Sequence, residues 1–225
     1  MKKNAKITLL WGVGFLALFA LWTALIRLVD VQPLGQNGTD IGFAAFNSCF
    51  HKMTGANMTL YYITDWAGLV PVFICMGFGI LGLSQLIKRK SLFKVDRDIL
   101  ILGIYYILVI FGYLLFEAIP INYRPVLIES RLEASYPSST TLLVACVMPT
   151  LIEQLNRRLK NTTVKRIIAI AAISFSAFMI IGRLISGVHW FTDIAGSLFL
   201  SAGLFCIYKA FVMLCDKGEK QNGTW

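Results

Sequence analysis

The residues best suited to chemistry lie in one short stretch that contains an arginine, a histidine six positions later and an aspartate four positions after that: Arg183, His189 and Asp193. His189 and Asp193 are i and i+4 at an expected helix start, so they share one face. A carboxylate there can accept the imidazole N–H, fix the tautomer and leave the other ring nitrogen free as a nucleophile. Arg183 offers a forked donor for a phosphate group. The alternative is that Asp193 caps the helix while Arg183 and His189 are interfacial anchors.

A second polar cluster precedes this stretch in the sequence. Arg124 adds another cation, and Pro137 suits the first turn of a helix, where its missing N–H is no loss. The hydroxyl residues Ser138, Ser139 and Thr140 follow it. Free backbone N–H groups at a helix N-terminus, together with such hydroxyls, can form an anion-binding cradle. Taken alone, the pattern is better explained by an ordinary Ser/Thr helix cap. The interpretation as an anion-binding cradle is better supported when both clusters are considered, because they are expected at the same membrane face.

The composition indicates which elements must position these residues. Of the 225 residues 57% are hydrophobic and 15% charged, whereas soluble domains average about 45–50% apolar and about 25% charged residues. Six apolar segments have roughly the length that a bilayer-spanning helix needs. They are 7–29, 67–87, 99–116, 136–155, 167–184 and 190–214. The sequence therefore predicts an all-α polytopic membrane protein, a six-helix bundle that forms a single domain over residues 1–225.

The basic residues predict the orientation of this bundle. Most of the 21 Lys and Arg residues lie at the N-terminus, in 88–97, in 157–166 and after Cys215. By the positive-inside rule these segments and both termini are cytoplasmic. The connections 30–66, 117–135 and 185–189 then face the non-cytoplasmic side, and both polar clusters meet that membrane face. The segment 41–50 is expected to form a short interfacial helix. The net charge of +9 is spread between apolar segments, unlike the clustered charge of a nucleic-acid-binding protein.

The two clusters resemble the motifs of the type-2 phosphatidate phosphatase superfamily, also called lipid phosphate phosphatases. The three family motifs read Lys-x6-Arg-Pro, Pro-Ser-Gly-His and Ser-Arg-x5-His-x3-Asp. The third matches here with Gly182 in place of Ser, and the second is present only as Pro137-Ser138-Ser139-Thr140. The first survives as Arg124-Pro125. The six-span layout, the motif order and the outward face also match, so the resemblance covers most of the chain.

The resemblance implies a role for each matching residue. His189 would attack phosphorus and become phosphorylated, and Asp193 would orient it. The phosphate-binding residues expected from the cradle and the resemblance together are Arg124, Ser138, Ser139, Thr140 and Arg183. The family uses no metal, so neither a metal nor another cofactor is expected. The sequence contains only two histidines, His51 and His189.

Two positions depart from the family pattern. Glu117 stands where the family has Lys, and Thr140 stands where the family has the His that protonates the leaving oxygen. Loss of a general acid typically costs about 10²–10⁴-fold in rate. The substitute acids considered are Glu117, Glu133 and Tyr136, with Glu129 and His51 also on the outward side. The alternatives are that Glu133 is a solvated loop carboxylate and that Glu117 pairs with Arg124 or Arg131.

The expected function is that of a membrane lipid phosphatase at the non-cytoplasmic face of the plasma membrane. Its partners would be a phosphorylated lipid and the surrounding membrane lipids. Cleavage of a lipid diphosphate expels a phosphate with a second pKa of about 6, and this leaving group needs little assistance from a general acid. A polyprenyl diphosphate, such as undecaprenyl diphosphate, is therefore favoured over a phosphatidate-like substrate. A lipid-linked phosphotransferase and a weak or inactive lipid-phosphate-binding or transport protein are the alternatives. The sequence makes no prediction of oligomeric state.

Overall fold

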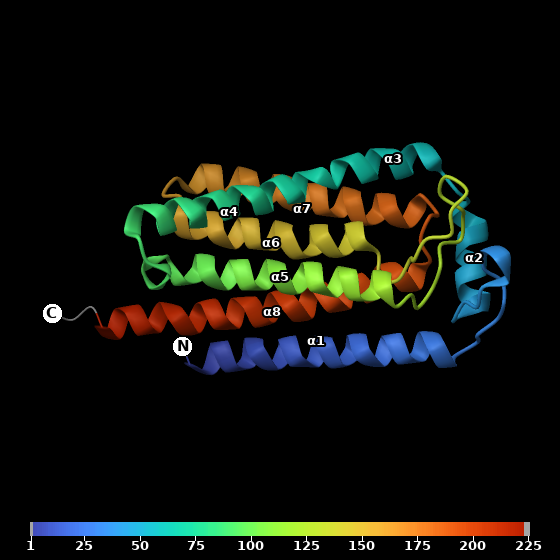
Figure 1. The fold of residues 1–225 in the computed structure, drawn as a ribbon, viewed down its shortest axis with the longest axis horizontal. Coiled ribbons are helices and arrows are strands. Elements are labelled where there is room, and N and C mark those ends of the chain that lie inside the picture. The colour runs from blue at the N-terminus through green and yellow to red at the C-terminus, as the bar shows by residue number, and fades with distance from the viewer. Residues whose placement is uncertain (1, 223–225) are drawn as a thin grey trace.

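In the computed structural model, which describes residues 2–222, long helices run side by side and a short helix crosses one end of them (Figure 1). Isolated bridges are the β-structure found in this part of the chain. The α-helices are α1 (Lys2–Leu28), α2 (Ala44–Thr54), α3 (Met58–Ala67), α4 (Leu69–Arg89), α5 (Arg97–Ala118), α6 (Ser139–Arg158), α7 (Thr162–Ile185) and α8 (Phe191–Asn222). The 3₁₀ turns are η1 (Gln36–Gly38) and η2 (Leu92–Lys94). The predicted all-α class is confirmed.

Within the described residues, five helical segments are long and apolar enough to cross a membrane. They are Lys3–Leu28, Met58–Arg89, Arg97–Ala118, Thr162–Ile185 and Phe191–Cys215. Helix α6, which contains most of the expected segment 136–155, is not among them. It packs against α4, α5, α7 and α8, and buries polar residues such as Thr150 and Gln154 along its length. Because α6 faces protein over much of its surface, its sequence can be more polar than that of its lipid-facing neighbours.

The second apolar segment starts earlier than the sequence predicts. The sequence predicts a loop over 30–66 followed by a span at 67–87, but α3 begins at Met58 and leads almost directly into α4. Asn57 caps α3, because its side chain accepts a hydrogen bond from the Leu60 N–H. The cap and the apolar run behind it begin the helix early. As a result Asp65 lies inside an apolar helical segment. The predicted short helix at 41–50 is observed as α2, which crosses the end of the bundle (Figure 1).

Helices α1 and α8 pack closely through glycines on both sides. A Cβ on Gly203 would lie 2.7 Å from Leu16 Cδ2, and a Cβ on Gly12 would lie 3.1 Å from the Gly203 carbonyl oxygen. Three glycines of α4, at Gly77, Gly79 and Gly82, differ in their surroundings. Added Cβ atoms at Gly77 and Gly79 would meet nothing within 4 Å, whereas one at Gly82 would lie 3.1 Å from Ile99 Cγ2 on α5. Glycines thus allow close packing at the α1–α8 contact and, at Gly82, between α4 and α5, while Gly77 and Gly79 leave open space along α4.

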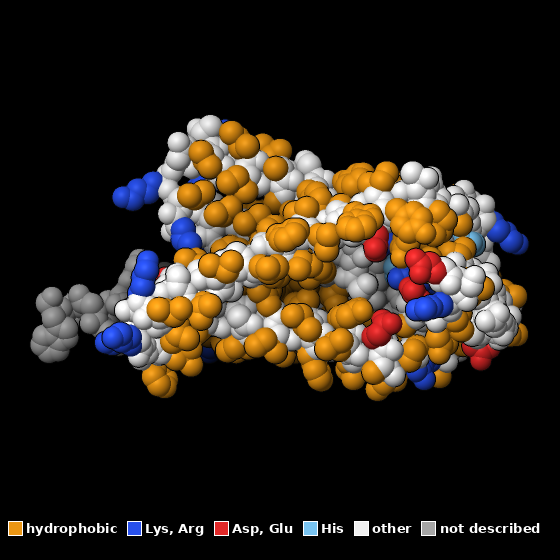
Figure 2. All heavy atoms as spheres, turned by 45° about the horizontal axis from the view of Figure 1, so that its top comes forward, with side chains coloured by type: hydrophobic (Ala, Val, Ile, Leu, Met, Phe, Trp, Pro, Cys, Tyr) orange, Lys and Arg blue, Asp and Glu red, His pale blue; other side chains and the backbone are white. Residues whose placement is uncertain are grey.

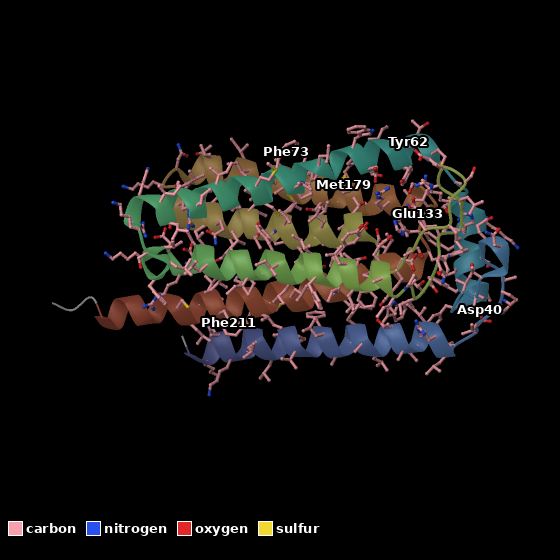
Figure 3. The ribbon with its side chains drawn as sticks, viewed as in Figure 1. Asp40, Tyr62, Phe73, Glu133, Met179 and Phe211 are labelled. Carbon is pink, nitrogen blue, oxygen red and sulfur yellow. The ribbon has the colours of Figure 1, made fainter. Side chains whose placement is uncertain are left out.

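An aromatic cluster joins α1 to the start of α6. The ring of Tyr136 stacks on Phe19 at 6.0 Å and meets Phe116 edge-on at 5.8 Å. Its hydroxyl shares a 2.6 Å hydrogen bond with Thr23. Around this core the outer helix surfaces are apolar: Figure 2 shows hydrophobic side chains along the bundle and charged ones at its two ends. In Figure 3 Phe73 and Phe211 lie on the sides of the bundle, whereas Glu133 lies at the end crossed by α2.

The α1–α8 contact gives a stability prediction. We expect Gly203→Leu to lower the free energy of unfolding by about 1–3 kcal/mol, because the new side chain would overlap Leu16 on α1. Gly14→Leu is the matched control, since a Cβ at Gly14 meets nothing within 4 Å. Thermal unfolding of both variants in detergent checks the prediction. Equal melting temperatures for the two variants would contradict it.

Candidate active site

The connection between α5 and α6 folds back on itself and thereby positions Arg124. The Arg124 N–H donates to the Glu133 carbonyl at 3.1 Å, and the Ser135 N–H donates to the Asn122 carbonyl at 2.9 Å. At the tip, Glu129 and Ser130 both have positive φ, of 49° and 63°. Two left-handed residues in succession make the tight turn that lets the two arms pair. Because neither tip residue is glycine, the sequence carries no strong signal for this hairpin.

The α7–α8 connection is held by close backbone contacts. Gly187 has a φ of +66°, and a Cβ there would overlap the backbone of Gly55. The Asn57 N–H donates to the Ser186 carbonyl at 2.9 Å. Gly182 is also tightly placed, because a Cβ on it would lie 2.7 Å from Thr64 Cγ2. That contact gives a physical reason for glycine at a position where the resembled motif has serine.

His189 is held in a single orientation by a backbone group. Its Nδ1 lies 3.1 Å from the Ser135 carbonyl oxygen. A carbonyl only accepts hydrogen bonds, so Nδ1 must carry the proton and Nε2 must carry the lone pair. Nε2 is buried and has no hydrogen-bond partner within the protein. The imidazole therefore presents a free lone pair from a side chain that is only 3% exposed.

Contrary to the sequence prediction, Asp193 does not accept the imidazole N–H directly, but supports His189 through other contacts. Its Oδ2 is 3.8 Å from His189 Nδ1, which is too long for a hydrogen bond. Instead, Oδ2 accepts from the Trp190 N–H at 2.9 Å, and Oδ1 accepts from Asn122 Nδ2 at 3.3 Å. The carboxylate thus fixes the backbone beside His189 and lies near enough to stabilise an imidazolium.

The charges around His189 keep it neutral. Burial contributes most, followed by the positive charges of Arg124 and Arg183, and together they hold the pKa of His189 well below its ordinary value. The hydrogen bond to the Ser135 carbonyl acts in the opposite direction and is the smaller effect. A neutral imidazole at physiological pH is the form that can act as a nucleophile.

Both arginines are buried with unused donors. Arg183 is 1% exposed and Arg124 is 8% exposed. The Nε and Nη1 atoms of both guanidinium groups are buried without a well-aligned hydrogen-bond partner, and of these Arg124 Nε forms an ion pair with Glu133 Oε2 at 3.2 Å. Both groups lie beside the Tyr61 ring, with Cζ-to-centroid distances of 4.9 Å for Arg183 and 5.6 Å for Arg124. Buried donors that lack partners are costly, and an anion bound among them would supply the missing acceptors.

One residue of this site, Asp65, was not found from the sequence. Arg183 Nη2 donates both to Asp65 Oδ1 at 2.6 Å and to Thr140 Oγ1. Asp65 comes from α3 and its side chain is 51% exposed, so it balances the charge of Arg183 from the outer side. The sequence analysis predicts a loop around Asp65, and the Asn57 cap that starts α3 earlier is the signal that would place Asp65 on a helix.

A cavity of about 200 Å³ lies in front of His189. Arg124, Ser135, Ser139 and His189 are among its lining residues. Ser138, one of the expected phosphate-binding residues, is fully buried, and its hydroxyl donates to Thr141 Oγ1 at 3.1 Å. The structure therefore brings the cations, the imidazole and Ser139 together and turns the Ser138 hydroxyl towards its own helix.

The considered substitute acids differ in position. Glu117 and Glu133 both line the 200 Å³ cavity. Glu133 Oε2 lies 3.2 Å from Arg124 Nε, so Arg124 pairs with Glu133 across the hairpin. Tyr136 also contributes to the lining, but its hydroxyl is engaged by Thr23 on α1. His51 lies on α2, where its ring meets Trp190 at 5.6 Å.

Within residues 2–222, no group of three or more His, Cys, Asp and Glu side chains is arranged to hold a metal ion. The donors that face the cavity are instead the N–H groups and hydroxyls described above. Their chemistry matches a phosphate group, because a planar guanidinium group can donate to two phosphate oxygens at once and the phosphate carries negative charge.

Comparisons with known proteins show the family and the fold of the chain. The PAP2 superfamily model matches residues 72–216. A similar solved structure is the crystal structure of a transmembrane PAP2-type phosphatidylglycerolphosphate phosphatase from Bacillus subtilis, at 20% identity and a TM-score of 0.65. That match covers 91% of this chain and 96% of the other chain. No curated protein matches the chain. The apolar helices and this neighbour support an integral membrane protein. With a family model that covers well over half of its length, the chain belongs to the PAP2 superfamily, as its motifs predicted.

Proposed function

We propose that this protein is a membrane phosphatase that removes a phosphoryl group from a lipid phosphate or a polyprenyl diphosphate through a phosphohistidine on His189. One observation carries the proposal: the free Nε2 of His189 and the unpartnered N–H groups of Arg124 and Arg183 are buried in the same neighbourhood. An imidazole lone pair surrounded by unused cationic donors is suited to attack on a phosphate whose oxygens those donors bind.

The site would face the non-cytoplasmic side of the plasma membrane, with α6 as the sixth span and both termini in the cytoplasm. The first and last described helices begin and end at the same end of the bundle, opposite α2 and the candidate site (Figure 1). Figure 2 places Lys and Arg side chains at that end, and a mixture of acidic and basic side chains at the other. The positive-inside rule supports this orientation.

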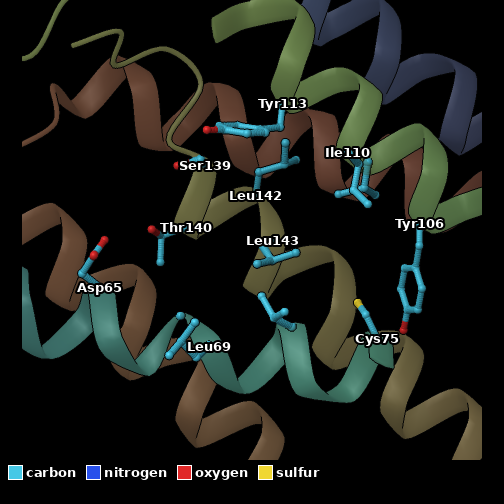
Figure 4. A pocket seen from close by; sticks show the side chains of 13 residues that line it. Asp65, Leu69, Cys75, Tyr106, Ile110, Tyr113, Ser139, Thr140, Leu142 and Leu143 are labelled. Atoms are coloured by element: carbon cyan, nitrogen blue, oxygen red, sulfur yellow. The ribbon is translucent and has the colours of Figure 1, made fainter. Parts of the chain in front are cut away.

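An apolar groove supports a lipid as the substrate. We call the cavity of about 440 Å³ between α4, α5 and α6 the upper groove. It shares Tyr113 and Ser139 with the cavity in front of His189. Figure 4 shows Asp65 and Thr140 at one end of it and Leu143, Ile110 and Tyr106 farther along. A lipid whose phosphate lies at His189 could therefore place its apolar chain in the upper groove.

The proposed reaction has two steps. His189 Nε2 attacks phosphorus, the bond from phosphorus to the leaving oxygen breaks, and the arginines stabilise the negative charge on the phosphoryl oxygens. The developing imidazolium keeps its Nδ1 hydrogen bond to the Ser135 carbonyl and lies 3.8 Å from Asp193 Oδ2. Water then attacks the phosphohistidine, which releases inorganic phosphate and restores the neutral imidazole.

The leaving group determines how much acid assistance the first step needs. Thr140 donates poorly and is already the acceptor for Arg183. A lipid diphosphate leaves as a lipid monophosphate, whose second pKa of about 6 makes it a good leaving group without protonation. A lipid monophosphate leaves as an alkoxide and requires a proton. The carboxyl groups placed in the cavity to supply one are Glu117 and, once a bound phosphate has replaced it at Arg124, Glu133. The site thus favours diphosphates.

The first prediction concerns the nucleophile. We expect His189→Ala to reduce phosphate release from lipid diphosphates on the order of 10⁴-fold or more, because no other side chain replaces the attacking nitrogen. The wild-type protein should trap an acid-labile, alkali-stable phosphoenzyme that the variant lacks. His51→Gln serves as the histidine control and should retain turnover. Wild-type protein that binds these lipids but never releases phosphate would overturn the proposed function.

The second prediction concerns pH. The pKa of His189 lies well below its ordinary value, so the ring should stay neutral as the pH falls. In a ¹⁵N-histidine-labelled His51→Gln protein, the remaining histidine should keep the spectrum of the Nδ1–H tautomer between about pH 8 and pH 6, across the ordinary value of about 6.5. Protonation of His189 near the ordinary value would contradict the proposed electrostatics.

The third prediction concerns the proton donor. We expect Glu133→Gln to lower kcat for a lipid monophosphate by about 10²–10⁴-fold, with a smaller loss for the matching diphosphate. Glu117→Gln, which alters the other carboxyl group in the cavity, is the paired variant. The ratio of monophosphate to diphosphate turnover identifies the donor. Wild-type turnover of the monophosphate that equals or exceeds that of the diphosphate would reject the proposed preference.

A further inference from the structure

A second apolar cavity continues the upper groove towards the opposite end of the bundle. It has a volume of about 420 Å³ and lies between α4 and α5. It shares Cys75 and Tyr106 with the upper groove. We call it the lower groove. Gly79, Gly82 and Gly103 are among its lining residues.

The two grooves follow one continuous stripe on each helix. On α4 the lining residues recur every three or four positions, from Leu69 in the upper groove to Leu86 in the lower groove. On α5 the stripe runs in the opposite direction, from Tyr113 to Ile99. This spacing keeps the lining residues of α4 on one face, whereas nearly consecutive residues of α5, from Ile99 to Ile107, line the lower groove over a broader face. The cavities therefore form one apolar path that starts beside the candidate active site.

The path is longer than one leaflet. Leu69 and Leu86 are separated by 17 residues of continuous helix, which corresponds to about 26 Å along α4. The hydrocarbon core of a bilayer is about 30 Å thick, so one leaflet provides about half of that. The two grooves meet at Cys75, about 9 Å along α4 from Leu69. An ordinary acyl chain anchored at the outer face would therefore fill the upper groove and reach only the first part of the lower groove.

The shape of the lower groove favours a branched chain. Added Cβ atoms at Gly79 and Gly103 would meet nothing within 4 Å, so both glycines leave open space in the groove. The groove ends near η2, where Arg89 pairs with Asp96 at 2.8 Å and closes the path with charged groups. The open positions can accommodate the methyl branches of an isoprenoid chain along an otherwise smooth apolar surface.

We infer that the lower groove binds the distal isoprene units of a polyprenyl diphosphate whose chain is longer than one leaflet, and that it selects substrates by chain length. This inference rests on the proposed function, because the diphosphate would lie at His189. It is carried by the continuity of the lower groove with the upper groove and by their combined length.

The test compares a long and a short substrate, undecaprenyl diphosphate and farnesyl diphosphate, under identical detergent conditions. Wild-type kcat/KM should be higher for the long chain. Gly79→Phe should lower kcat/KM for undecaprenyl diphosphate about tenfold and leave farnesyl diphosphate unchanged, because the new ring fills only the lower groove. Gly103→Phe blocks the groove from the α5 side and should act in the same way.

Gly77→Phe is the matched control. It introduces the same side chain on α4 at a position with open space around it and outside the lining of either groove. It should leave kcat/KM unchanged for both diphosphates. If the groove variants lower kcat/KM equally for both diphosphates, or for neither, the inference is overturned. If the wild type hydrolyses neither diphosphate, the proposed function fails instead. Direct binding of the two diphosphates to the wild type and the same variants then tests the groove. Tighter binding of the long chain that is lost in Gly79→Phe supports the inference, and equal binding of the two chains overturns it.

Discussion

Two buried arginine side chains beside one buried imidazole form the arrangement on which the rest of the structure depends. Arg124 and Arg183 repel each other and disfavour protonation of His189. Asp65 and Glu133 each balance one of these cations from a partly exposed position. The remaining donors are left without partners. Such an arrangement is costly for an empty site, and it becomes favourable when a phosphate group supplies negative charge and acceptors.

The helical bundle accommodates this cost by separating lipid-facing from protein-facing surfaces. The outer surfaces of the apolar helices are covered by hydrophobic side chains (Figure 2), while α6 carries buried polar residues between its neighbours. Polar side chains in a membrane protein are tolerated where other helices provide hydrogen-bond partners. Thr140, at the start of α6, links this polar interior to Arg183. The same helix contributes Ser139 to both the phosphate-sized cavity and the upper groove, so the charged and apolar parts meet there.

Much of this organisation could be predicted from the sequence because it depends on local pattern. Apolar segments of membrane length, with basic residues alternating between them, predicted the helices. The Arg183, His189 and Asp193 spacing predicted the family. The start of α3 was missed because its cap at Asn57 lies in a stretch that looked like a loop, and Asp65 was missed with it. Such a cap is a weaker signal than hydropathy, and it extended the helix beyond the apolar core of the segment.

The sequence by itself determined the helix class, the family and the residue types available for binding phosphate, since these follow from composition and from the spacing of residues within short segments. Only the tertiary structure decided how those residues are used. It gave the imidazole N–H to the Ser135 carbonyl rather than to Asp193, turned the Ser138 hydroxyl towards α6, and aligned α4 with α5 into a groove. These features depend on contacts between segments distant in the chain, where the direction of each side chain is set by packing rather than by its neighbours in sequence.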